Sequence, residues 1–266
     1  MSREFLATDV TSRTLSKHFD HLLQSPPRPR RRETRTEVFI KTDAQYLSHY
    51  DCIILVKEER ELIYWQHFQR ETFQAYLIVF SHLQELGYDV IGVTSDWHGS
   101  IVGAVKHMYG DNIPHQRCLV HIQRRCQSLL TKNPKSEAGK QLLELVKFLN
   151  KISNKYEKQI WIKWFEGLEE RHGDFITERT YGVKEDGSKT WWYTHKNVRA
   201  AYRSIRSSID HLFLYLEHEN LDKDTNGIES EFSHLKQKIN VHRGLKLKRK
   251  IAAIYWYFYF VNQRRN

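Results

Sequence analysis

The sequence predicts an α/β fold built on a mixed β-sheet that is interrupted by a long helical insertion. Three segments rich in β-branched and aromatic residues follow one another closely, at residues 37–47, 51–57 and 61–68, as expected for strands. From residue 72 helical and strand patterns alternate, and from about residue 122 to 218 the periodicity is largely helical. Three strands in a meander followed by alternating helices and strands indicate a mixed sheet.

The alternating part begins with an amphipathic helix over residues 72–86, which Gly87 ends. An apolar strand at residues 90–94 then runs directly into Ser95 and Asp96, and a helix is expected over residues 100–108. A short strand around residues 116–120 completes this part. That order of elements is the RNase H-like layout.

The largely helical stretch is predicted to contain helices over residues 122–130, 141–150, 156–171 and 197–217. A polar interlude at residues 181–194 could form a small hairpin. Its tandem Trp191 and Trp192 could stack on an extruded base, but packing in a core is the favoured interpretation. The last stretch, residues 225–265, predicts one helix, a pause at Arg243-Gly244-Leu245 and a final aromatic helix.

The N-terminal region resembles a helix-turn-helix. Residues 5–24 are amphipathic, and the second helix of such a pair, bearing Arg13 and Lys17, would face DNA. The Pro/Arg run at residues 26–32 indicates a linker, and its arginines could also follow a phosphate backbone. We therefore predict five segments, which are a DNA-binding segment (1–25), a basic linker (26–36), a first core part (37–130), a helical insertion (131–224) and a C-terminal core part (225–266).

Charge and composition favour a protein that binds a polyanion and argue against a membrane or secreted protein. The net charge is +10, and residues 232–266 contain nine Lys/Arg and no acid, which suits a protein that grips a polyanion. Clusters of this kind can also serve solubility alone. No apolar run is long enough for a membrane span, and no secretion signal is recognised. Three cysteines are too few for a disulfide framework, so a reducing compartment is expected.

Three acids could bind metal. Asp43 interrupts an otherwise apolar strand, Asp96 ends another strand, and Glu229 precedes an apolar helix. Each has a simpler explanation, which is solvent exposure on an edge strand for Asp43, a turn or helix cap for Asp96, and a capping box with Asn226 for Glu229. If they converge, their carboxylates suit two Mg²⁺ ions, with Mn²⁺ as a substitute.

A C-x-x-H pair, Cys118 and His121, supplies two of the four ligands that a structural zinc site needs. Cys126, His98 and His115 are the candidates to complete such a site. A buried cysteine and a hydrogen-bonded histidine are the favoured interpretation.

Four motifs in order resemble the DDE transposases of bacterial insertion sequences related to the Mutator superfamily. They are TSDWHGSI (94–101), RCLVHIQRRC (117–126), NPKSEAGKQLL (133–143) and TNGIES-EF-HLK with HRGL (225–245). The resemblance spans roughly residues 37–262 and implies that Asp43, Asp96 and Glu229, rather than Glu231, are the catalytic metal ligands. Cys118 and His121 match the C-x-x-H element of that family.

The resemblance implies Mg²⁺-dependent cleavage at transposon ends and joining of the 3′-hydroxyl to target DNA. Two alternatives are an RNase H-like nuclease without joining activity and an inactive DNA-binding remnant, and a third is a helical zinc-binding module. Expected partners are double-stranded DNA and further copies of the chain, in a dimer or higher multimer, with no membrane. A bacterial cytoplasmic, nucleoid-associated location is expected. The residues predicted to contact DNA are Arg13, Lys17, Arg30, Arg31, Arg32, Lys236, Lys238, His242, Arg243, Lys246, Lys248, Arg249 and Lys250.

Overall fold

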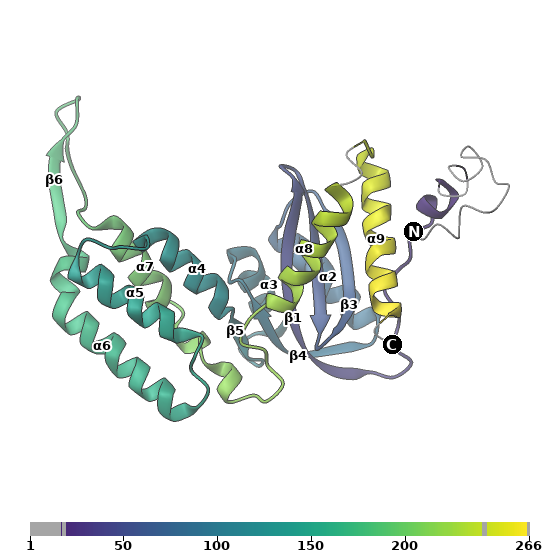
Figure 1. Cartoon of the computed structure of the whole chain (residues 1–266), viewed down its shortest axis with the longest axis horizontal. Helices are drawn as coiled ribbons and strands as arrows, with labels where there is room; N and C mark the ends of the chain where they lie inside the picture. The colour runs from purple at the N-terminus through teal and green to yellow at the C-terminus, as the bar shows by residue number, and fades with distance from the viewer. Residues whose placement is uncertain (1–16, 18–19, 241–243, 265–266) are drawn as a thin grey trace.

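The computed structural model describes residue 17 and residues 20–240 and 244–264, and Figure 1 shows how its elements are arranged. The predicted helix-turn-helix-like segment, including Arg13, lies almost entirely outside the described residues, as do His242 and Arg243. Lys17 is described and exposed, and a helical turn covers residues 20–24. DNA binding by this segment therefore stays a prediction.

A five-stranded mixed sheet forms the centre of one half of the molecule. Its strands, in the spatial order β3-β2-β1-β4-β5, are β1 (Thr36–Ser48), β2 (Asp51–Glu58), β3 (Glu61–Phe68), β4 (Tyr88–Ser95) and β5 (His115–Arg117). The first three pair antiparallel, whereas β4 runs parallel to β1 and β5 parallel to β4. The predicted meander and the mixed α/β class are confirmed.

Helices cover both faces of this sheet. One face packs on α2 (Phe73–Glu85) and α3 (Gly99–Tyr109), and the other on α8 (Asn226–Asn240) and α9 (Leu247–Gln263). Successive side chains of a strand point to opposite faces, so Ile54 and Val56 of β2 belong to one core and Ile53 and Leu55 to the other. Burial on both sides explains why β2 is apolar without alternation.

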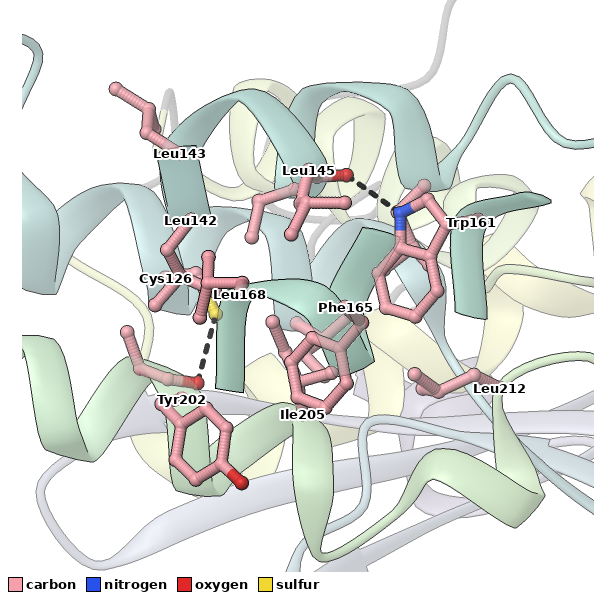
Figure 2. Close-up of a cluster of buried hydrophobic side chains, with 14 of the residues drawn as sticks. Cys126, Leu142, Leu143, Leu145, Trp161, Phe165, Leu168, Tyr202, Ile205 and Leu212 are labelled. Carbon is pink, nitrogen blue, oxygen red and sulfur yellow. Dashed lines mark hydrogen bonds between the residues drawn. The ribbon is translucent and has the colours of Figure 1, made fainter. Parts of the chain in front are cut away.

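Four further helices pack into a separate core beside the sheet. They are α4 (Leu119–Leu130), α5 (Glu137–Leu149), α6 (Lys155–Thr177) and α7 (Lys196–Arg206). Figure 2 shows its centre, where the rings of Trp161 and Phe165 stack with centroids 5.5 Å apart. The indole N–H of Trp161 donates to the carbonyl of Leu145 at 2.9 Å, so this large buried side chain leaves no polar atom unpaired.

Some predicted elements have the wrong extent. The helix expected over residues 197–217 ends at Arg206 and is followed by two short 3₁₀ turns, Ile209–His211 and Leu214–Leu216. The buried guanidinium of Arg117 donates to the carbonyl of Ser204 and to the hydroxyl of Ser208, which satisfies polar groups that a helix end leaves open. The strand expected over residues 116–120 stops at Arg117, because α4 already begins at Leu119.

No helix in the described part of the chain has the length and apolar character that crossing a membrane requires.

Candidate active site

The parallel pairing of β1 with β4 brings the first two predicted acids to the same level. Lys41 pairs with Thr94 in this register, so Asp43 and Asp96 each lie two residues further along their chains. Residues at the same level of neighbouring strands share a face. Asp96 also follows the last residue of β4, at the strand end where ligand sites gather in α/β sheets.

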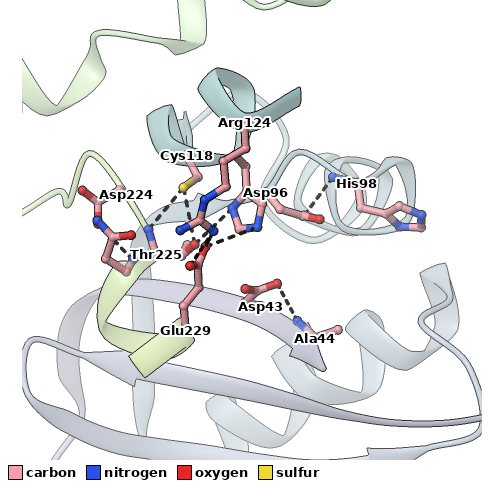
Figure 3. Close-up of polar contacts among 11 residues, drawn as sticks. Asp43, Ala44, Asp96, His98, Cys118, Arg124, Asp224, Thr225 and Glu229 are labelled. Atoms are coloured by element: carbon pink, nitrogen blue, oxygen red, sulfur yellow. Dashed lines mark hydrogen bonds and ion pairs between the residues drawn. The ribbon is translucent and has the colours of Figure 1, made fainter. Parts of the chain in front are cut away.

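The first turns of two helices complete the site. α4 contributes His121, and α8 contributes Glu229. One ligand atom from each of Asp43, His121 and Glu229 lies within 4.8 Å of the other two. Asp96 lines the same cleft of about 420 Å³, as Figure 3 shows. Four residues that are far apart in the sequence therefore line one cleft, namely Asp43, Asp96, His121 and Glu229.

Asp96 stands slightly apart from the other acids. Among the described residues it is not a member of the closely spaced group of three, and one of its carboxylate oxygens accepts a hydrogen bond from the His98 N–H at 2.9 Å. The turn role, which was the simpler explanation for Asp96, is thus present in the structure. The second carboxylate oxygen is not engaged by that bond.

Asp43 is partly buried on β1 rather than exposed on an edge, because β1 lies between β2 and β4. The pKa of its carboxyl is raised to about 7, chiefly by burial and also by the negative charges of Asp96 and Glu229. His121 and the hydrogen bond from the Ala44 N–H act in the opposite direction. A cation between these groups would relieve both the burial cost and the repulsion.

Arg124 supplies a positive charge at the mouth of the cleft. Its Nη1 donates to both carboxylate oxygens of Glu229, at 2.6 and 2.5 Å, and the Arg124 side chain is 58% exposed. The capping box predicted for Glu229 and Asn226 is not formed. In a capping box the Asn226 N–H would donate to Glu229. In the structure it donates to Asp224 at 2.9 Å instead.

A hydrogen-bonded chain fixes the position of His121. The Sγ of buried Cys118 accepts from the N–H and hydroxyl of Thr225, at 3.3 and 3.4 Å. The same hydroxyl lies 3.4 Å from His121 Nδ1. If Nδ1 carries the proton and donates to Thr225, then His121 Nε2, 3.6 Å from Glu229, presents a lone pair to the cleft.

Cys118 itself lies away from the cleft. It is fully buried, and burial raises the pKa of its thiol, which disfavours the thiolate that zinc requires. In the described part of the chain it does not share the close grouping of His121 with Asp43 and Glu229. This agrees with the favoured interpretation, in which the cysteine is structural.

Glu231, the acid two residues after Glu229, points to the interior. Its carboxylate is 2.9 Å from the Nζ of Lys57, and both side chains are less than 10% exposed. Lys57 also donates to the Gly227 carbonyl at 3.3 Å. This buried pair anchors the first turns of α8 on the sheet, so that Glu229 is held over the cleft.

The predicted basic residues occupy different environments. Lys236 lines the cleft, and Lys238, Lys246 and Lys248 are exposed. The others that the structure describes are Arg30 and Arg31, both exposed, Lys250, half-buried, Arg249, which pairs with Asp20 at 2.7 Å, and Arg32, which pairs with Glu61 at 3.0 Å. Arg32 is therefore tied to the sheet rather than lying in a free linker.

Two residues at the site were missed at the level of sequence. Arg124 follows His121 by three positions, a spacing that places both on one face of a helix and could have identified it. Trp97 could not be identified in this way. It has a φ of 72°, unusual for a bulky residue, and its ring lies between His115 and His211 with centroids 4.7 and 4.5 Å away. These contacts hold the turn that carries Asp96.

A comparison with protein-family models matches residues 94–242 to the family described as "Transposase IS66 family". The match covers more than half of the chain and includes Asp96, the C-x-x-H pair and Glu229, whereas Asp43 lies before it. It supports a transposase of an insertion sequence, and the relation to the Mutator superfamily stays a prediction. A comparison with curated proteins gives no match.

Proposed function

Because the chain belongs to the IS66 family of transposases, we propose that its cleft cleaves DNA at transposon ends and joins the freed 3′-hydroxyl to target DNA. The observation that carries this proposal is the meeting of Asp43, Asp96 and Glu229 in one cleft. The mixed sheet would then be an RNase H-like catalytic core related to that of the Mutator superfamily, with helices α5 to α7 in its insertion.

The donor set fits divalent cations. Carboxylates favour hard cations such as Mg²⁺ and Mn²⁺, and Asp43, Asp96 and Glu229 would hold them, with His121 Nε2 as a further possible ligand. Two ions held there would supply the activation of a water or a 3′-hydroxyl and the stabilisation of the leaving oxygen. Burial and the neighbouring acids raise the pKa of Asp43, and a bound cation would lower this pKa because it favours the charged carboxylate.

The side chains of the chain itself would perform the remaining work. Arg124 pairs with Glu229 at the cleft, and its exposed guanidinium would bind a DNA phosphate, which it can do in bidentate fashion. Lys236 at the cleft wall would contact the backbone near the cleaved bond. Thr225 and Cys118 would keep His121 in place.

The basic residues at the start of α9 would bind the DNA backbone on either side of the cleaved bond. Lys246 and Lys248 are exposed there, and contacts of this kind raise affinity without selecting sequence. Reaction at two transposon ends would require more than one copy of the chain, so we expect a dimer or higher multimer on bacterial DNA in the cytoplasm, at the nucleoid.

The test is cleavage of a supercoiled plasmid that carries the two ends of the host element. We expect the purified full chain to nick it with Mg²⁺ or Mn²⁺ and to leave it intact with EDTA, because the carboxylates cannot act without cations. A plasmid without the ends is the control. Equal nicking in EDTA would rule out the metal mechanism, and DNA binding without nicking in either metal would indicate an inactive remnant.

A further inference from the structure

The hairpin between α6 and α7 carries the tandem tryptophans away from any core. Its strands are β6 (Arg179–Val183) and β7 (Lys189–Tyr193), and Figure 1 shows the hairpin projecting from the helical part of the molecule. Trp191 and Trp192 are 46% and 50% exposed. The favoured interpretation of these residues as core packing is therefore wrong.

One face of this hairpin gathers aromatic and basic side chains. Cross-strand pairs join Arg179 with Tyr193, Tyr181 with Trp191, and Val183 with Lys189, and paired residues share a face. We call these six residues the hairpin face. Tyr181 is 74% exposed, so most of its side chain is open to solvent. The opposite face carries Trp192, whose ring packs over Gly182.

Cations lie directly on the rings of the hairpin face. The guanidinium of Arg179 is 4.2 Å from the ring centre of Trp191. That of Arg199, on α7, is 3.6 Å from the ring centre of Tyr193 and donates to its hydroxyl at 3.0 Å. Among the described residues no carboxylate pairs with either guanidinium. The two acids of the hairpin, Glu185 and Asp186, lie in the turn outside the face.

A face of this composition suits nucleic acid. Bases stack on aromatic side chains, and basic groups between them bind phosphate. Duplex DNA keeps its bases stacked inside, so it would use the cations and leave the bare ring of Tyr181 without a partner. A second copy bound through the same face would oppose like side chains, and the six residues of the hairpin face include two cations and no carboxylate, so such a contact has no charge complementarity.

We propose that the hairpin face binds unpaired DNA, with bases stacked on Tyr181 and Trp191 and phosphates held by Arg179 and Lys189. This rests on the proposed function to the extent that DNA is the substrate. It adds a second binding site, on the opposite side of the helical core from the sheet, which takes single-stranded rather than duplex DNA.

The experiment is fluorescence anisotropy of the full chain with a labelled single-stranded oligonucleotide and with its duplex, in EDTA. We expect the Tyr181→Ala, Trp191→Ala double variant to bind the single strand roughly tenfold more weakly or worse, with duplex affinity nearly unchanged. Arg179→Gln, which leaves both rings in place, should weaken binding to the single strand as well. Thermal melting checks that the variants fold.

Two controls match the altered side chains. Tyr156→Ala removes a tyrosine on α6 that is 72% exposed, and Trp192→Ala removes the tryptophan on the other face. Both should bind the single strand like the wild type. Unchanged affinity in the double variant, or an equal loss in Trp192→Ala, would overturn the proposal. So would a multimer, measured by sedimentation, that dissociates in the double variant, because a second copy would then occupy the face. Binding is measured without metal, so failure of cleavage would leave this result intact.

Discussion

Replacing Glu229 by Gln is expected to slow metal-dependent cleavage by about 10³-fold or more. The substitution keeps the shape of the side chain and removes the negative charge that would hold a divalent cation beside Asp43. Stabilisation of the transition state by bound metal contributes several kcal/mol, and each 1.36 kcal/mol corresponds to a factor of ten in rate. Single-turnover cleavage of transposon-end DNA in Mg²⁺ measures the effect.

The stability of the protein should hardly change in this variant. The substitution weakens the ion pair of Glu229 with Arg124, whose side chain is 58% exposed, and exposed pairs contribute about 0–1 kcal/mol. Glu144→Gln alters an exposed glutamate on α5 and serves as the matched control. Cleavage by Glu229→Gln within about tenfold of the wild type would exclude Glu229 as a metal ligand.

Replacing Glu231 by Leu should lower the free energy of unfolding by about 3–5 kcal/mol, the usual loss when one partner of a buried pair is removed. The Nζ of Lys57 would remain in the interior without the carboxylate that now lies 2.9 Å away. The Lys57→Met, Glu231→Leu double variant should recover most of this loss, because apolar residues can replace a buried pair. Urea unfolding measures both.

An exposed pair provides the comparison. Lys147 and Glu144 lie 2.7 Å apart, and their side chains are 49% and 60% exposed, so Glu144→Leu should cost less than about 1 kcal/mol. A loss in Glu231→Leu no larger than this, or a double variant no more stable than the single one, would contradict the anchoring role of the buried pair.

The sheet was predictable because its strands are buried on both faces. Ile53 to Val56 is an unbroken apolar run, and the short polar turns on either side of β2 mark its ends. The end of α7 was not predictable, since the helical pattern continues past Arg206. The helix stops where Arg117, distant in sequence, takes up the carbonyl of Ser204, and sequence periodicity carries no trace of such a contact.

The candidate site was predictable in its acids and not in their partners. Asp96 stands out because it ends an apolar strand, and the order of motifs singles out Glu229. The ion pair of Glu229 with Arg124 depends on how α4 lies relative to α8. The separation of Asp96 from the group formed by Asp43, His121 and Glu229 also depends on the packing of these elements. The prediction for Trp191 and Trp192 was wrong for a related reason. Aromatic residues usually indicate a core, and the exposure of these two follows from a hairpin that projects from the helical part of the molecule.

The most direct measurement is a strand-transfer assay with transposon-end DNA and a target plasmid, comparing the wild type with Asp96→Ala in the presence and absence of Mg²⁺. We predict a joined product that requires Mg²⁺ and disappears in Asp96→Ala, because that carboxylate lines the cleft with Asp43 and Glu229. Cleavage without joining would indicate a nuclease. Joined product from Asp96→Ala at the wild-type rate would contradict the proposal that these three acids form the catalytic site.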